Sequence, residues 1–366
     1  MPHVQTSITD DTRIRRLRPL LPPAILLESH PLDESAAAFV ARSRAEVASV
    51  VARQSDRLLV VVGPCSIHDV SAGLEYARFL MNLRERWDDA LMVVMRVYFE
   101  KPRTTVGWKG LINDPRLDGT FRINEGLTMA REFLVQLAGM GMAAGSEFLD
   151  TISPQFIADT VAWGAIGART TESQVHRELA SGLSMPVGFK NGTDGSVKVA
   201  IDAVTAARHP HCFLSVTKEG LAAIVETHGN PDTHVILRGA SSGPNFDEAS
   251  VARTCTLLQD AGLPASVMVD CSHGNSAKDH RKQVEVASDV ARRIAAGEDR
   301  ITGVMLESNL VEGRQAPGPR ETLVYGCSIT DACISLDTTV QVLDGLANAI
   351  RTRRTFTGAT EAGAQP

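Results

Sequence analysis

Short apolar runs recur along the chain at intervals that suit a repeating strand–helix unit. The first run, at 58–62, reads Leu-Leu-Val-Val-Val, which is too short for a helix and typical of a strand buried on both faces. Comparable runs occur at 91–95, 142–148, 163–168, 185–189, 234–237, 266–269 and 302–306. The pattern therefore predicts eight strands.

Segments with helical spacing separate most of these runs. They lie at 127–137, 171–180, 197–206, 247–258 and 279–296, and another is expected at 35–53. Asp69 is placed to cap a further helix over 70–86. Eight strands alternating with helices predict an α/β fold, a (β/α)8 TIM barrel. A doubly wound open sheet is the structural alternative.

Two regions depart from this alternation. The stretch 211–227 predicts an inserted β-hairpin between strands 5 and 6, with its turn at 218–220. Residues 1–54 predict an N-terminal arm and a first helix for regulation or assembly, although a partly ordered tail explains the polar, proline-containing start equally well. We expect the catalytic barrel at 55–350 and a disordered C-terminal tail at 351–366.

Composition narrows the class of protein. The chain has 366 residues, of which 43% are hydrophobic and 22% charged, as in an ordinary globular enzyme. Its net charge of -6 argues against a nucleic-acid binder but leaves room for a local basic pocket. We see no 18-residue apolar run and no signal segment, so we expect a cytoplasmic protein without a membrane span. The six cysteines have no CxxC spacing, which argues against a zinc finger or a disulfide framework.

Ionisable residues follow nearly every predicted strand. A parallel barrel brings strand ends to one face, which is the catalytic face in barrel enzymes. One set is cationic and predicts an anionic, phosphorylated small substrate, although any single member would be explained as a surface charge. Its members are Arg96, Lys101, Arg103, Arg169, Lys190 and Arg238.

A second set combines a thiol, an imidazole and two carboxylates. These ligands suit a divalent transition metal such as Mn, Fe, Co or Zn better than Mg or Ca. Spacing alone leaves the metal open, because a buried thiol and an ordinary loop histidine explain the same residues, and a nucleophilic Cys65 paired with a histidine is a chemical rival. The set comprises Cys65, His273, Glu307 and Asp331.

Five motifs at these strand ends resemble one family. They are GPCSIHD at 63–69, MRVYFEKPRTTVGWKG at 95–110, GARTTES at 167–173, GFKNGTDG at 188–195 and SITD at 328–331. Together they resemble class I 3-deoxy-D-arabino-heptulosonate 7-phosphate (DAHP) synthases of the microbial, aromatic-amino-acid-regulated branch, over residues 10–354. A departure lies after Arg238, where Ala240 replaces a frequent glycine and the loop has one more residue than usual.

The resemblance implies a transferase that condenses phosphoenolpyruvate with erythrose 4-phosphate and releases inorganic phosphate, the first step of the shikimate pathway. It implies a metal held by Cys65, His273, Glu307 and Asp331, with Lys101 as a candidate proton donor. It implies phosphoenolpyruvate contacts at Arg96, Lys101, Glu147, Ala168, Arg169, Lys190 and Arg238. It assigns Arg103 and Thr104 to the erythrose phosphate.

The resemblance also implies feedback inhibition by phenylalanine or tyrosine, and a homodimer or homotetramer. The candidate effector residues are Asp10, Asp11, Ile14, Asp150, Pro154, Gln155, Leu179, Ser184, Phe213 and Val225. Packing between subunits is the alternative explanation for many of them. Two rival functions remain: a barrel aldolase or octulosonate-type synthase for another sugar phosphate, and a silent binding protein, which the intact Cys65 and Lys101 disfavour.

Overall fold

The predicted barrel is confirmed. A computed structural model describes residues 9–103 and 107–362, and eight parallel strands close in the order β1-β10-β9-β8-β5-β4-β3-β2. The strands are β1 (Leu58–Gly63), β2 (Leu91–Arg96), β3 (Ala144–Glu147), β4 (Trp163–Ile166), β5 (Val187–Lys190), β8 (Thr233–Leu237), β9 (Val267–Asp270) and β10 (Ile301–Glu307). Each matches a predicted apolar run to within a few residues, and the open-sheet alternative is wrong.

The alternation of side chains along β1 separates two apolar layers. Leu58, Val60 and Val62 pack with the surrounding helices, whereas Leu59 and Val61 pack inside the barrel. The interior layer also contains side chains from the first long helix, α2 (Glu34–Val51), which is therefore positioned to cover the amino-terminal end of the barrel. The end of the barrel at which the strands finish is therefore open for a functional site.

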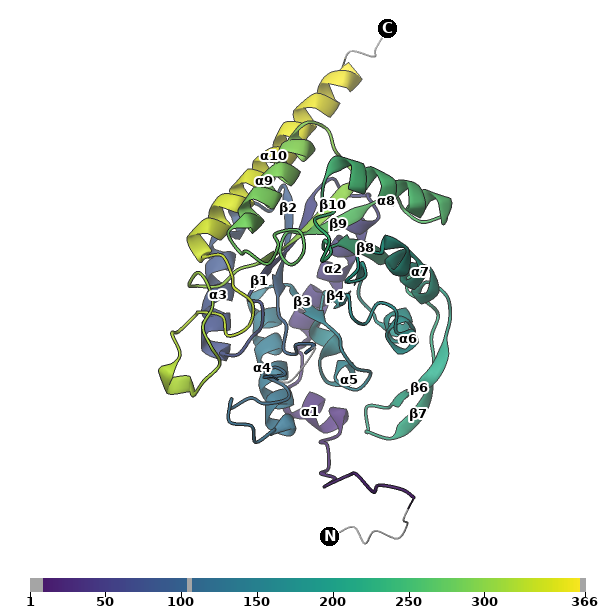
Figure 1. Cartoon of the computed structure of the whole chain (residues 1–366), viewed down its shortest axis with the longest axis vertical. Coiled ribbons are helices and arrows are strands. Elements are labelled where there is room, and N and C mark those ends of the chain that lie inside the picture. Colours follow the sequence, from purple (N-terminus) through teal and green to yellow (C-terminus); the bar gives the residue numbers. More distant parts are fainter. Residues whose placement is uncertain (1–8, 104–106, 363–366) are drawn as a thin grey trace.

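In the part of the chain that the structure describes, seven longer helices each follow a barrel strand (Figure 1). They are α3 (Val70–Leu83), α4 (Ile123–Met140), α6 (Gln174–Gly182), α7 (Val197–Ala207), α8 (Glu248–Asp260), α9 (Lys282–Ala295) and α10 (Leu336–Ala362). Short pieces are α5 (Pro154–Ile157), η1 (Arg84–Arg86), η2 (Ala158–Thr160) and η3 (Arg320–Thr322). Asp69 caps α3 as predicted, since its carboxylate accepts a hydrogen bond from the Ala72 amide at 3.0 Å.

The carboxyl-terminal helix differs from the sequence expectation. Residues 351–362 continue α10 rather than forming a disordered tail, and in Figure 1 the helix runs beside α9 with its carboxyl-terminal end projecting beyond it. Arg351 pairs with Asp89 at 2.6 Å, and Arg354 pairs with Asp56. These ion pairs hold the helix against the barrel where its apolar periodicity is weak. Residues 363–366 lie outside the described part of the chain.

The inserted hairpin is confirmed and contacts the N-terminal arm. Strands β6 (Cys212–Val216) and β7 (Ala222–Glu226) pair antiparallel outside the barrel. The arm's short helix α1 (Pro23–Ser29) joins the hairpin through a hydrogen bond from the Ala24 amide to the Lys218 carbonyl, at 2.6 Å. Within the described residues, no helix is both long and apolar enough to cross a membrane.

Candidate active site

The predicted cations converge on one cavity at the carboxyl ends of the strands. The cavity has a volume of about 310 Å³. All six members of the cationic set line it, although they come from different strands and loops. The predicted site residues in its lining are Arg96, Lys101, Arg103, Glu147, Ala168, Arg169, Lys190, Arg238, His273 and Asp331. Thr104 lies outside the described residues.

Arg96 is the most deeply buried of these cations. It lies at the end of β2 with 1% of its surface exposed, and its guanidinium forms an ion pair with Glu307 at 2.9 Å. The guanidinium also stacks on the Tyr98 ring, 3.6 Å from the centroid. Because a buried charge is costly unless it is paired, these contacts hold Arg96 in one orientation at the base of the cavity.

Lys101 lies beside the predicted metal ligand Cys65. Its ammonium donates a hydrogen bond to the Cys65 carbonyl at 2.9 Å. Burial works to lower the pKa of Lys101, but the neighbouring Cys65 and Glu307 outweigh it, and the pKa lies above its ordinary value. Lys101 therefore contributes a positive charge to the cavity.

Gly167 leaves room for Glu147, the one carboxylate among the predicted substrate contacts, to approach the cavity. A Cβ atom at Gly167 would lie 2.1 Å from Glu147 Oε1. The GARTTES motif thus needs its first residue to be glycine, since any side chain there would displace Glu147. Two residues later, Arg169 donates a hydrogen bond to the Pro102 carbonyl at 3.3 Å and joins this loop to the one after β2.

Three of the four predicted metal ligands form one compact group. Ligand atoms of Cys65, Glu307 and Asp331 all lie within 4.8 Å of one another. Cys65 and Glu307 are buried, and burial raises the pKa of the Cys65 thiol. Sulfur with two carboxylates is a donor set for a divalent transition metal rather than for Mg or Ca. The chemistry of the group therefore fits the predicted ion.

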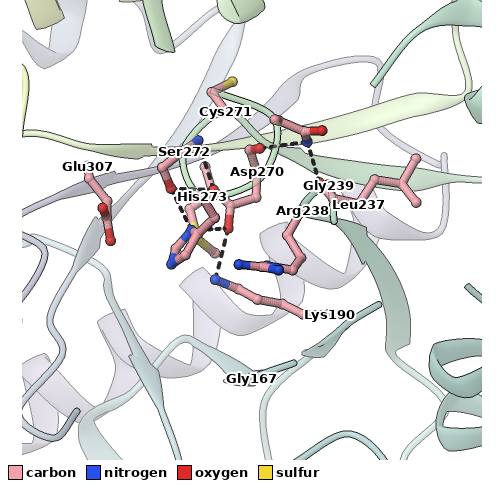
Figure 2. Close-up of polar contacts among 12 residues, drawn as sticks. Gly167, Lys190, Leu237, Arg238, Gly239, Asp270, Cys271, Ser272, His273 and Glu307 are labelled. Atoms are coloured by element: carbon pink, nitrogen blue, oxygen red, sulfur yellow. Dashed lines mark hydrogen bonds and ion pairs between the residues drawn. The ribbon is translucent and has the colours of Figure 1, made fainter. Parts of the chain in front are cut away.

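His273 lies beside this group rather than within it. The histidine lines the same cavity as Asp331, but its Nδ1 faces Asp270 Oδ2 at 2.9 Å and Ser272 Oγ at 2.8 Å. Figure 2 shows the ring between Asp270 and Glu307. Its backbone has φ +56°, a left-handed conformation that is uncommon for histidine. The strand-end argument thus placed His273 at this cavity, but it did not predict its contacts with Asp270 and Ser272.

The sequence assigned no role to two buried side chains that support the proposed ligands. Gln283 on α9 accepts from the Glu307 amide at 2.8 Å and donates to the Glu307 carbonyl at 3.1 Å. Asp270 accepts from Lys190 Nζ at 2.9 Å. A glutamine in an amphipathic helix carries no sequence signal for such a role. Asp270 did have a signal, because it ends a buried strand.

The predicted effector residues divide between a second cavity and the arm. A cavity of about 640 Å³ lies between the hairpin, α2 and the loop after β3. Its lining includes Pro154, Gln155, Leu179, Ser184, Phe213 and Val225 from the predicted set. Asp150 instead accepts hydrogen bonds from the Ile152 and Ser153 amides. Asp10, Asp11 and Ile14 are exposed on the arm and do not line this cavity.

Comparisons with known proteins agree with this geometry. The model of the DAHP synthetase I family matches residues 30–344. The chain is 59% identical over 345 residues to the "Phospho-2-dehydro-3-deoxyheptonate aldolase, Phe-sensitive" of Escherichia coli strain K12, covering 94% of this chain and 98% of that one. It is 53% identical over 349 residues to a tyrosine-inhibited enzyme of that name from Schizosaccharomyces pombe, covering 94% of each.

A solved structure leads to the same family. The phospho-2-dehydro-3-deoxyheptonate aldolase of Francisella tularensis SCHU S4 superimposes with a TM-score of 0.91 at 50% sequence identity. The match covers 93% of this chain and 99% of that one. The chain therefore belongs to the DAHP synthetase I family and is a 3-deoxy-7-phosphoheptulonate synthase.

Proposed function

We propose that the 310 Å³ cavity is where this synthase joins phosphoenolpyruvate to erythrose 4-phosphate and releases inorganic phosphate. The observation that carries the proposal is the convergence of six cations on one cavity beside a thiol–carboxylate group. Phosphoenolpyruvate carries both a carboxylate and a phosphate, so it needs several fixed positive charges in a partly dry site. The supporting feature is therefore electrostatic.

Within this cavity, we assign phosphoenolpyruvate to the deeper cations. Arg96 and Lys190 are almost fully buried, and Arg238 is half-buried beside them. Arg103 is exposed and donates a hydrogen bond to the Trp108 carbonyl at 2.8 Å, near the mouth. That position suits the phosphate of an aldose that enters after phosphoenolpyruvate.

A divalent transition metal would be held by Cys65, Glu307 and Asp331, with His273 as the fourth ligand. When bound, it supplies Lewis acidity toward the aldehyde oxygen or toward the attacking water. The chain's own residues do the positioning. Arg96 and Gln283 hold Glu307 by its carboxylate and its backbone, and Lys101 is held at the Cys65 carbonyl.

The chemistry then follows from the two substrates. C3 of phosphoenolpyruvate forms a bond to the aldehyde carbon, water adds at C2, and the C2–O bond to phosphate breaks. Lys101 lies at the cavity wall, where it can pair with the substrate carboxylate and donate a proton. The buried cations stabilise the negative charge that moves onto the departing phosphate.

Phosphate release tests this assignment. The protein is incubated with phosphoenolpyruvate and erythrose 4-phosphate, with and without a chelator, and with arabinose 5-phosphate as the alternative aldose. We expect phosphate release only with erythrose 4-phosphate, and its loss in chelator. Full activity of the metal-stripped protein would overturn the metal assignment, and a preference for arabinose 5-phosphate would favour the octulosonate-type alternative.

We also propose that the 640 Å³ cavity binds an aromatic amino acid that inhibits the enzyme. Leu179, Phe213 and Val225 offer an apolar surface for a ring, while Arg44 and Asp159 offer opposite charges for a zwitterion. Relatives named as Phe-sensitive and tyrosine-inhibited support this class of ligand. Assays with phenylalanine, tyrosine and tryptophan distinguish the effectors, and absence of inhibition by all three would refute the proposal.

Self-association is the remaining part of the proposal. Leu214 and Ile224 face each other in register on the hairpin and are 81% and 70% exposed. On the arm, Ile14 and Leu17 are more than half exposed. Such apolar surface on a single chain suits an interface between copies in a homodimer or homotetramer. Sedimentation analysis of wild type and Leu214→Glu tests this, because a monomeric wild type would contradict it.

A further inference from the structure

We propose that Asp270 is a positioning residue that holds His273 and Lys190 together and so connects the metal-binding and phosphoenolpyruvate-binding parts of the site. The inference rests on the proposed function, which makes His273 a metal ligand and Lys190 a contact for phosphoenolpyruvate. In this proposal Asp270 itself contacts neither the metal nor phosphoenolpyruvate. It acts through its two neighbours.

The first observation is that both oxygens of the Asp270 carboxylate have polar partners. Asp270 ends β9 and has none of its surface exposed. Its Oδ2 lies 2.9 Å from Lys190 Nζ and 2.9 Å from His273 Nδ1 (Figure 2). Its Oδ1 accepts hydrogen bonds from the Ser272 amide and hydroxyl. One carboxylate thus binds a lysine and a histidine that come from β5 and from the loop after β9.

The second observation concerns which nitrogen of His273 is free. Asp270 Oδ2 faces the Lys190 ammonium at 2.9 Å and His273 Nδ1 at 2.9 Å, and a carboxylate that pairs with an ammonium only accepts hydrogen bonds. Nδ1 of His273 therefore carries a hydrogen, and in the neutral ring Nε2 presents its lone pair. A carboxylate that fixes the tautomer and ring orientation of a metal-binding histidine strengthens the site.

Backbone contacts fix the loop after β9, which carries His273 next to Asp270. Asn275 donates to the Asp270 carbonyl at 2.9 Å and to the Leu237 carbonyl of β8 at 3.0 Å. A Cβ at Gly274 would lie 2.6 Å from the Ala240 amide nitrogen, so the loop packs directly on the backbone after β8. The backbone is thus held independently of the carboxylate, and a change confined to the Asp270 side chain tests its positioning role.

A second explanation makes a different prediction for the lysine. If Asp270 only balanced the charge of Lys190, its removal would leave the cavity more positive and anions would bind more tightly. If Asp270 positions Lys190, its removal lets the ammonium leave its place and phosphoenolpyruvate binds more weakly. The sign of the change in phosphoenolpyruvate affinity therefore separates positioning from charge balance.

The test compares Asp270→Asn with Ser272→Ala. Ser272 contacts Asp270 and His273 Nδ1, and its side-chain hydrogen bonds within the described part of the chain do not include Lys190. Cobalt affinity is measured by chelator competition, and phosphoenolpyruvate affinity by calorimetry on the metal-free proteins. We expect Asp270→Asn to lower cobalt affinity about 10- to 100-fold and phosphoenolpyruvate affinity about tenfold. Ser272→Ala should lower cobalt affinity alone.

Controls keep the outcomes distinct. Asp344→Asn removes another partly buried carboxylate, which accepts from Trp87 Nε1 at 2.8 Å far from the cavity, and should change neither affinity. The absorption spectrum of cobalt at saturation should change in Asp270→Asn, because the histidine ligand is displaced, while circular dichroism stays the same. If Asp270→Asn does not fold, the cobalt affinity of Ser272→Ala tests whether the hydrogen bonds around Asp270 position His273.

Wild-type affinity for both ligands in folded Asp270→Asn, or tighter phosphoenolpyruvate binding, would overturn the inference. So would an effect of Ser272→Ala on phosphoenolpyruvate alone. Failure of the underlying function is recognised separately with His273→Ala. If His273→Ala binds cobalt as well as the wild type does, the metal assignment fails; if it loses cobalt while Asp270→Asn does not, only the positioning role fails.

Discussion

Glu100 offers a stability prediction whose size follows from its surroundings. The residue directly precedes Lys101 in the loop after β2, and its backbone forms a β-bridge with Gly110. Ser153 Oγ lies 3.4 Å from its carboxyl group. Burial, with the nearby charges of Asp150 and Glu147, raises its pKa from 4.5 to about 8. At neutral pH the folded protein therefore holds Glu100 as the neutral acid.

The sign of the pH dependence follows from linkage. Unfolding lets Glu100 ionise, so the folded chain binds more protons between pH 4.5 and about 8. The stability contribution is full below pH 4.5 and is lost as the pH rises to about 8, with no further loss above that value. A fully buried group with this shift would change the free energy of unfolding by about 5 kcal/mol; partial exposure reduces our expectation to about 2 kcal/mol.

Glu100→Gln replaces the neutral acid with a neutral amide of the same size. We expect the variant to match the wild type at pH 5 and to be more stable by about 2 kcal/mol at pH 8.5. Equilibrium urea unfolding from pH 5 to pH 9 measures this difference. Glu85→Gln, a change at an exposed carboxylate, is the matched control. Parallel curves for wild type and Glu100→Gln across the whole range would refute the reasoning.

Four further substitutions test the candidate sites. Cys65→Ser and His273→Ala should each lose metal, by elemental analysis, and nearly all activity, because each removes a proposed ligand; retained activity would contradict the metal site. Arg103→Ala should raise KM for erythrose 4-phosphate at least tenfold and leave phosphoenolpyruvate affinity unchanged, since Arg103 lies at the cavity mouth; equal losses for both substrates would argue against that assignment. Phe213→Ala should weaken inhibition by the aromatic effector about tenfold at unchanged uninhibited kcat, because it removes apolar wall from the second cavity.

The sequence was sufficient to predict the barrel and most of the residues that line the candidate active site. Short valine-rich runs such as 58–62 have little choice of structure, since they are too short for helices and too apolar for the surface. Parallel closure then brings every strand end to one face, so an ionisable residue after a run is a site candidate by position alone. Arg96, Lys190 and Arg238 were identified as candidates in this way.

The sequence could not predict contacts that depend on distance between elements. Gln283 looks like an ordinary residue of an amphipathic helix until α9 packs against the end of β10. The tail at 351–362 lacked a strong apolar pattern, and its helix is held by ion pairs whose partners lie about 260 residues earlier or more. Periodicity carries no information about such partners.

The amino-acid sequence by itself determined the strands, their order and the side chains that reach the catalytic face, because local apolar patterning and barrel closure leave few alternatives. Only the tertiary structure decided which of those side chains contact one another. It gave Cys65, Glu307 and Asp331 a common position, set His273 beside them, and joined His273 to Lys190 through Asp270. These contacts depend on the relative positions of residues far apart in the chain, and spacing in a sequence does not show such positions.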